Sequence, residues 1–201
     1  MTLRESAVEI ELRKRLEAIL RQAPGLMQVL ATARDLDLPD WLIMSGAVYQ
    51  RVLNHLTGRP PDYGIKDYDL GYFDASDISY EAEDVVIRRV AAAFDEPLRS
   101  LVEVRNQARV HVWFEGKYGE AYSPLTSTSE ALRRFVSPMF AVGVRQDAGG
   151  ELLIEAPFGL ADLFAMRLRP NRERPVIASY ERIAASAQAR WPEIVVEPRR
   201  A

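Results

Sequence analysis

Two neighbouring stretches decide the fold: MSGAVYQRVLNHLTG at residues 44–58 and IKDYDLGYFD at residues 65–74. The first places Gly46 where a short apolar strand would enter a helix whose apolar residues recur at helical spacing. The second predicts a strand on which Asp67 and Asp69, two residues apart, point to the same face. Two ionised carboxylates placed in this way repel each other, so either water or a cation must offset the repulsion.

The remainder of the chain predicts a mixed order of helices and strands. A first helix is expected to begin at a capping box formed by Thr2 and Glu5 and to continue through Leu20, and further helices are expected over residues 26–36, 46–57, 80–94, 159–171 and 179–191. Strands are expected over residues 41–45, 68–73 and 101–114. A hairpin is expected over residues 140–157, with its turn at 147–150. This order indicates an α/β or α+β fold, a mixed sheet with helices mainly on one face. We expect one structural domain, in which N-terminal helices within residues 1–40 pack on a core over residues 41–201.

The composition is that of a soluble globular protein. The chain has 201 residues, a net charge of −3 and 48% hydrophobic residues. It has no cysteine, which excludes disulfides, thiolate zinc sites and cysteine nucleophiles, and its two histidines are too few for a three-histidine zinc site. No apolar run approaches the roughly 20 residues of a membrane span, and the first residues lack a signal-peptide core. We therefore expect a cytoplasmic protein that binds neither a membrane nor extended DNA.

Residues 101–114 alternate in period two and predict a long strand, with a bulge or break near Asn106. Its polar face would carry Glu103, Arg105, Gln107, Arg109 and His111. Lys66, Arg105 and Arg109 are candidates for binding a triphosphate, and we favour Lys66 and Arg109. Alternatively each is a solvated charge on the face of a strand. His111 would orient a substrate or act as a base, unless it is a structural histidine.

The two opening stretches together favour phosphate chemistry. Free backbone N–H groups from Ser45 to Val48, at the start of a helix, suit a phosphate. The carboxylates of Asp67 and Asp69 suit Mg²⁺, which prefers oxygen ligands and phosphate, and Gly71 would leave their face of the sheet open. Metal ligands beside a phosphate site indicate phosphoryl or nucleotidyl transfer. The alternative is that both aspartates are exposed sheet residues without a function. The aromatic residues Trp113, Phe114, Phe135, Phe158 and Trp191 are interpreted as core side chains rather than as a base-stacking platform.

Three motifs carry a family resemblance: KDYDLGYFD at residues 66–74, EVRNQARVH at 103–111 and APFGLADLF at 156–164. They resemble a bacterial nucleotidyltransferase-like family, formerly described only as a domain of unknown function, within the DNA polymerase β-like nucleotidyltransferase superfamily. The resemblance covers residues 40–195, nearly the whole chain apart from the first helices. It implies a polymerase β-like core in which carboxylates hold Mg²⁺ while a hydroxyl attacks the α-phosphate of a nucleoside triphosphate.

The resemblance also implies roles for particular residues. Gly46 carries the turn, and Asp67 and Asp69 form the metal-binding pair. Glu103 is identified as the third carboxylate, either as a metal ligand or as the acceptor of the hydroxyl proton; alternatively it is a solvated strand residue. The turn reads Ser-Gly-Ala, where the superfamily pattern has Gly-Gly or Gly-Ser. Ser45 therefore precedes the glycine.

Two further residues enter through the resemblance. Relatives carry an arginine just after the turn, where this chain has Tyr49, and Arg51 would substitute for it. Asp162, within APFGLADLF, is included as a candidate site residue, although its position also suits a residue that caps or braces a helix.

Two hypotheses of different classes follow. The first is a Mg²⁺-dependent nucleotidyltransferase, in which Mn²⁺ could substitute, that moves a nucleoside monophosphate from a nucleoside triphosphate to a hydroxyl acceptor. The acceptor would be a small molecule, a protein or a tRNA end. The second is a catalytically inactive descendant that uses the same fold to bind a nucleotide, a protein or an RNA partner.

Overall fold

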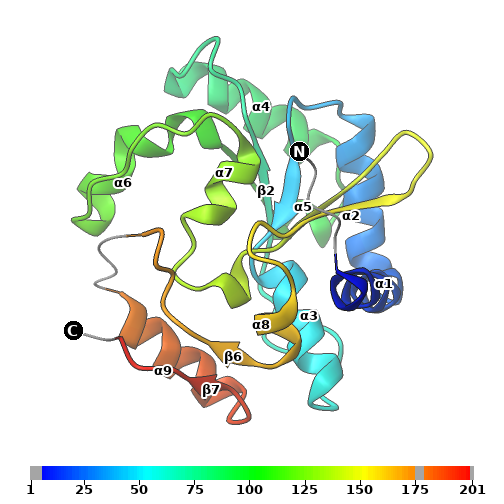
Figure 1. Ribbon diagram of the computed structural model, residues 1–201. Coiled ribbons are helices and arrows are strands. Elements are labelled where there is room, and N and C mark those ends of the chain that lie inside the picture. Colours follow the sequence, from blue (N-terminus) through cyan, green and yellow to red (C-terminus); the bar gives the residue numbers. More distant parts are fainter. Residues whose placement is uncertain (1–5, 175–178, 200–201) are drawn as a thin grey trace.

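The computed structural model describes residues 6–174 and 179–199 (Figure 1). A five-stranded sheet in the order β3-β2-β1-β4-β5 lies at its centre, and a two-stranded sheet pairs β6 with β7. The strands are β1 Leu42–Met44, β2 Tyr68–Tyr72, β3 Val102–Asn106, β4 Gly143–Gln146, β5 Leu152–Glu155, β6 Arg167–Leu168 and β7 Val195–Val196. In the large sheet β2 and β3 are parallel and the other neighbours are antiparallel. The mixed α/β architecture expected from the sequence is therefore confirmed.

The helices surround this sheet unevenly. They are α1 Ala7–Arg21, α2 Pro24–Asp35, α3 Gly46–Leu56, α4 Tyr80–Ala92, α5 Leu98–Leu101, α6 Val110–Tyr118, α7 Thr128–Arg133, α8 Ala161–Phe164 and α9 Tyr180–Arg190. One face of the sheet buries Ile43, Leu70 and Val104 in the main hydrophobic cluster, where α2 and α4 pack against it. The opposite face carries Asp69 and Gly71, with α6 and α7 on that side of the molecule (Figure 1). Because these two short helices cover it only in part, that face keeps room for a cavity.

The strand–turn–helix unit expected around Gly46 is confirmed. The chain leaves β1 through Ser45, which has φ 64 and ψ −141, and α3 begins at Gly46. Val48, Val52 and Leu53 on α3 are fully buried. The helix ends before Gly58, whose φ of 67 is in the left-handed region that favours glycine. The position of Ser45 at the start of α3 is thus set by burial of the apolar residues behind it.

The break expected near Asn106 is confirmed, but the prediction that residues beyond it continue as a strand to 114 is wrong. At Asn106 β3 ends, a 3₁₀ turn spans Gln107–Arg109, and α6 follows. The cause is the buried Asn106 side chain, whose carbonyl oxygen accepts hydrogen bonds from the backbone N–H groups of Asp74 and Ala108 at 3.1 and 3.0 Å. A side chain that binds its own backbone two residues on favours a turn over continued strand pairing. Residues such as Val110 and His111, which look like strand residues by alternation, therefore lie on a helix.

Other expectations have mixed outcomes. The hairpin turn at residues 147–150 is confirmed, since the Asp147 carboxylate accepts from the N–H groups of Gly149 and Glu151. The helix expected over residues 159–171 is wrong in length, because α8 ends at Phe164 and the chain enters β6. The capping pair expected at Thr2 and Glu5 lies outside the described residues. In the described part of the chain, no helix has the length and apolar character needed to cross a membrane.

Candidate active site

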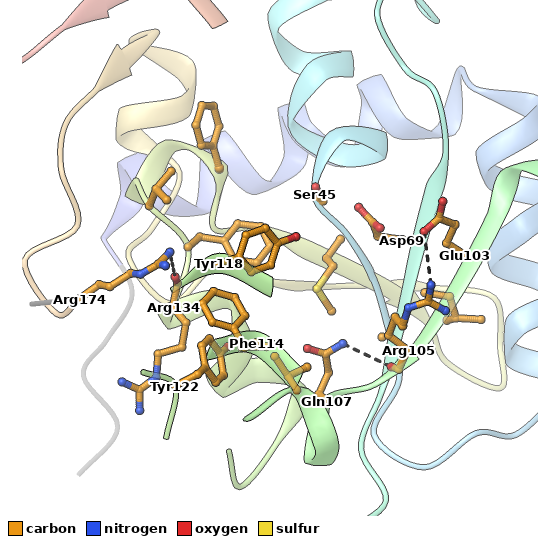
Figure 2. A pocket seen from close by; sticks show the side chains of 18 of the residues that line it. Ser45, Asp69, Glu103, Arg105, Gln107, Phe114, Tyr118, Tyr122, Arg134 and Arg174 are labelled. Atoms are coloured by element: carbon orange, nitrogen blue, oxygen red, sulfur yellow. Dashed lines mark hydrogen bonds and ion pairs between the residues drawn. The ribbon is translucent and has the colours of Figure 1, made fainter. Parts of the chain in front are cut away.

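Strand pairing brings two of the expected carboxylates together. In the parallel register of β2 and β3, Asp69 lies opposite Glu103, so both side chains leave the same face of the sheet. Figure 2 shows them beside each other, with Ser45 close to Asp69. Asp67 lies one residue before β2, and its negative charge acts on Asp69. The three carboxylates expected from the sequence thus lie at one end of β2 and β3.

The turn at Ser45 supplies a polar group to this carboxylate cluster. The Ser45 side chain lies close to the Asp69 carboxylate and lowers the pKa of that group (Figure 2). The φ of Ser45 is 64°, which is rare for a residue other than glycine, and strained backbone of this kind tends to occur at functional sites. Helix starts leave their first N–H groups without intrahelical acceptors. Of the donors expected from Ser45 to Val48, however, the Val48 N–H donates to the Ser45 carbonyl at 3.1 Å and is therefore not free. The combination suits a phosphate oxygen approaching the start of α3.

Gly46 packs closely against a side chain of its own helix. A Cβ atom built at this position would lie 2.6 Å from Nε2 of Gln50, which is four residues, or about one turn, further along α3. The glycine therefore lets the Gln50 side chain fold back against the start of the helix. The contact is with the end of a flexible side chain, and phosphate binding by Gly46 stays a prediction.

Burial and mutual repulsion change the protonation of the aspartates. The pKa of Asp69 is raised to about 6, first because the group is buried and then because of the charges of Asp67 and Glu103. The Ser45 side chain and the positive charge of Arg105 both lower the pKa of Asp69 and so oppose this rise. Burial also raises the pKa of Asp67, and the charge of Glu103 adds to the effect. These carboxylates therefore lie in a site where ionisation of both is costly unless positive charge is added.

Arg105 is the cation that the structure places beside the carboxylates. It lies two residues after Glu103 on β3 and opposite Gly71, and its guanidinium is 4.0 Å from the Glu103 carboxylate. Sequence reasoning named Arg105 but favoured Lys66 and Arg109 over it. The two-residue spacing of Glu103 and Arg105 would have selected Arg105, because every second residue of a strand lies on the same face.

Gly71 lines the cavity beside Asp69, as expected, but the space directly above it is filled by a side chain. A Cβ atom at this position would overlap with the Cε atom of Met44, and would lie 3.2 Å from Nε2 of Gln107. The Met44 side chain thus fills the space above Gly71, and the glycine is needed to fit it. Beyond Gln107 the surface turns into a cavity of about 460 Å³.

This cavity joins the carboxylates to an aromatic wall. Ser45, Asp69 and Glu103 line one end. The other end is lined by rings from α6 and the segment after it, together with two arginines: Trp113, Phe114, Tyr118, Tyr122, Arg134 and Arg174 (Figure 2). Sequence analysis missed this end, because Trp113 and Phe114 were interpreted as core residues. Both are only half-buried.

Two arginines expected to bind a triphosphate are held elsewhere by other groups. The Arg51 side chain is 2% exposed and donates hydrogen bonds to the Asp62 carboxylate at 2.7 Å and the Tyr68 hydroxyl at 3.3 Å. Arg109 forms an ion pair with the buried Glu83 and donates to the Ile78 carbonyl. Neither arginine lines the cavity in the described part of the chain. Both arginine side chains therefore link separate segments of the fold and have a structural role.

The remaining candidates are also away from the cavity. Lys66 is exposed, and its charge lowers the pKa of the neighbouring Asp67, against the larger effect of burial. His111 lies on α6 rather than on a strand, and its Nδ1 atom is buried without a hydrogen-bond partner. Asp162 is buried and accepts hydrogen bonds from Arg167 and Arg169, both at 2.7 Å. Asp162 thus braces the chain after α8, which is the structural role that its position suggested.

The donor chemistry of the carboxylate cluster fits Mg²⁺. Burial and neighbouring negative charge raise the pKa of Asp67 and of Asp69, an effect that a divalent cation would oppose. As the side chains stand, however, no three His, Asp or Glu residues of the described chain gather closely enough to hold a metal ion. Asp67, Asp69 and Glu103 are therefore the candidate ligands by chemistry and by their shared end of the sheet.

Comparison with known proteins identifies the family. A family model described as "Nucleotidyltransferase" matches residues 31–196, which is most of the chain. An NMR structure described as revealing a CCA-adding enzyme head domain matches with a TM-score of 0.74 and 21% identity, covering 92% of this chain and 96% of that one. No curated protein matches the chain. The structural match confirms the polymerase β-like fold, and the family match, over a segment that contains the strand–turn–helix unit and every candidate carboxylate, makes this chain a member of the nucleotidyltransferase family.

Proposed function

We propose that this protein transfers a nucleoside monophosphate from a nucleoside triphosphate to a hydroxyl acceptor, with Mg²⁺ as the cofactor. The observation that carries the proposal is the register of β2 and β3, which sets Asp69 opposite Glu103. Ser45, at the start of α3, lies against the same carboxylates. A set of oxygen ligands next to a phosphate-binding helix start is what nucleotidyl transfer requires.

The residues at the start of α3 would hold the triphosphate. The free N–H groups of the first turn point along the helix axis and, with the helix dipole, favour negative charge. Arg105 would add a positive charge from the β3 side of the cavity. Mg²⁺ bound by Asp67 and Asp69, with Glu103 either as a third ligand or as the base, would neutralise charge that develops on the phosphate oxygens.

The reaction itself is an in-line displacement. The acceptor oxygen forms a bond to the α-phosphorus, the bond from this phosphorus to the bridging oxygen breaks, and pyrophosphate leaves with the electron pair. The hydroxyl proton must pass to a base. Glu103 is the more exposed carboxylate, with 56% of its side chain accessible, so it can accept the proton and release it to water.

Transfer of label from an α-³²P nucleoside triphosphate tests this proposal. The wild-type protein with Mg²⁺ or Mn²⁺ should release pyrophosphate and label an acceptor from a panel of small hydroxyl compounds, proteins and tRNA. Asp69→Asn and Glu103→Gln should each reduce the rate by about 100-fold or more, as expected for loss of a ligand or a base. Asp74→Asn, two residues beyond the end of β2 and outside the cavity lining, is the matched control and should retain the rate. Equal rates in Asp69→Asn and wild type would contradict the assignment of the site.

A second candidate function is binding of a nucleotide, protein or RNA partner without catalysis. It is favoured by the separation of the three carboxylates and by the ion pair between Glu103 and Arg105 at 4.0 Å. Calorimetry with Mg²⁺ and each of the four nucleoside triphosphates separates the two functions. Binding without pyrophosphate release over the whole acceptor panel would favour this second function.

A further inference from the structure

The end of the cavity away from the carboxylates is formed by an aromatic cluster, which we define as Trp113, Phe114, Tyr118 and Tyr122. The ring of Phe114 lies 4.7 Å from that of Tyr118 and 4.5 Å from that of Tyr122 between centroids. The ring of Trp113 lies 6.1 Å from Phe114. All four side chains line the same cavity as Asp69 and Glu103.

These rings are not buried as a core would bury them. Tyr118 is 52% exposed, and the other three are half-buried. By contrast, Trp41 and Trp191 are 6% and 0% exposed, in the main hydrophobic cluster. Packing of the protein interior therefore does not account for the aromatic cluster. Adjacent aromatic rings exposed toward a cavity are typical of a site that takes an apolar or planar ligand.

The wall behind the rings is held in place by an arginine and its partners. The Arg174 guanidinium lies 5.7 Å from the centre of the Phe114 ring, and it forms an ion pair with Glu120 and a hydrogen bond to the Arg134 carbonyl. Burial raises the pKa of Tyr122 to about 12, so its hydroxyl stays neutral at physiological pH. The wall thus presents uncharged ring surfaces with cations beside them: Arg174 lies against Phe114, and the Lys117 ammonium lies 5.5 and 5.3 Å from the ring centres of Trp113 and Tyr118.

We infer that the aromatic cluster stacks against the nucleobase of the donor nucleoside triphosphate. The inference rests on the proposed function, because the triphosphate would lie at the Ser45 and Asp69 end of the same cavity. A ligand with a polyanion at one end and a flat, weakly polar ring at the other matches the two ends of this cavity. Aromatic side chains stack on any base, so the cluster would contribute affinity rather than strict base selection.

Fluorescence and calorimetry on single ligand parts test each end separately. Trp113 is the half-buried tryptophan, so a base that enters the cluster should quench its emission. The probes are the four Mg²⁺–nucleoside triphosphates, Mg²⁺–tripolyphosphate, which has no base, and the free nucleosides, which have no phosphate. We expect nucleosides and nucleoside triphosphates to quench, and tripolyphosphate to bind without quenching.

Two substitutions remove a ring face while keeping apolar bulk. Phe114→Leu should weaken binding of the nucleoside triphosphates by about 5- to 150-fold, the range of one base–aromatic stack, and leave tripolyphosphate unaffected. Tyr118→Leu, at a half-exposed position, should act in the same direction with little risk to folding. The matched control is Phe164→Leu, because Phe164 is also half-buried beneath an arginine, Arg15 at 4.8 Å, but lies outside the cavity.

The outcomes distinguish this inference from the proposed function. Equal affinity for nucleoside triphosphates and tripolyphosphate, unchanged in Phe114→Leu and Tyr118→Leu, would overturn the base-binding role while the phosphate site stands. Quenching by nucleosides that is lost in Phe114→Leu, without any binding of tripolyphosphate, would support base binding and contradict the phosphate site. If a short oligoribonucleotide acceptor binds more weakly to Phe114→Leu while the triphosphates do not, the cluster serves the acceptor, and the donor assignment is wrong.

Discussion

Replacing Asp69 by asparagine should stabilise the metal-free protein while it removes activity. The pKa of Asp69 rises from 3.8 to about 6 in the folded chain, a shift of about 2 units, or about 3 kcal/mol at about 1.4 kcal/mol per unit. Because the folded-state pKa is above the unfolded value, the folded protein binds the proton more tightly. The stability that this provides is complete below about pH 4 and is lost as the pH rises to about 6. Asparagine is uncharged at every pH in this range, so the variant does not lose this stability as the pH rises.

Urea unfolding of the metal-free protein measures the effect. The free energies of unfolding of Asp69→Asn and wild type should agree most closely at about pH 4. Between about pH 4 and about pH 7.5, the free energy of unfolding of the variant should rise relative to that of wild type by up to about 3 kcal/mol. The gain is an upper value, since Asp67 and Glu103 also adjust when the central charge is removed. The nucleotidyl-transfer rate of the same variant should fall, as many active sites trade stability for function.

Asp74→Asn is a control with the opposite sign. Hydrogen bonds from Ser76 hold the pKa of Asp74 below its usual value, so folding favours its ionised form. Its contribution to stability is present above about pH 4 and is lost as the pH falls through the lowered pKa, so Asp74→Asn should lose stability at neutral pH. If the free energies of Asp69→Asn and wild type differ by the same amount at every pH, repulsion among the carboxylates does not set the stability of the site and the reasoning fails.

Three further outcomes are expected. Mg²⁺ should raise the melting temperature of the wild type more at about pH 7.5 than at about pH 5 and leave Asp69→Asn unchanged, as followed by differential scanning fluorimetry; an equal rise in that variant would argue for a site elsewhere. Gly71→Ala should cost about 1–3 kcal/mol in urea unfolding, since its new methyl group meets Met44, and an unchanged midpoint would show that Met44 moves aside freely. Arg51→Met should lower stability by about 1.5–3 kcal/mol and leave calorimetric affinity for Mg²⁺–nucleoside triphosphate nearly unchanged; the reverse pattern would restore the ligand-binding role expected from the sequence.

Local patterns in the sequence were enough to place the core of the candidate site. The apolar run before Ser45 and the helical spacing after it predicted β1, the turn and α3. The spacing of Asp67 and Asp69 predicted a shared strand face, which depends only on the two-residue period of β structure. Glu103 was selected by resemblance, and the register of β2 and β3 then set it opposite Asp69. The turn and α3 rest on interactions within a few residues, whereas the pairing of Asp69 with Glu103 is a contact between distant segments, and Asp67 lies one residue outside the strand on which it was expected.

The tertiary structure decided which cations and rings accompany the carboxylates. Arg109 looked like a ligand-binding residue until α4 brought Glu83, which is 26 residues away in the sequence, into contact with it. Asn106 ended a strand that alternation would have continued, because its side chain reached Asp74, 32 residues earlier. That turn moved Trp113 and Phe114 from an expected core onto α6, beside the cavity. The sequence by itself determined the helix start and the close spacing of Asp67 and Asp69, because local backbone geometry governs them. The aromatic wall and the choice of Arg105 over Arg109 depended on contacts between distant segments, which no local period encodes.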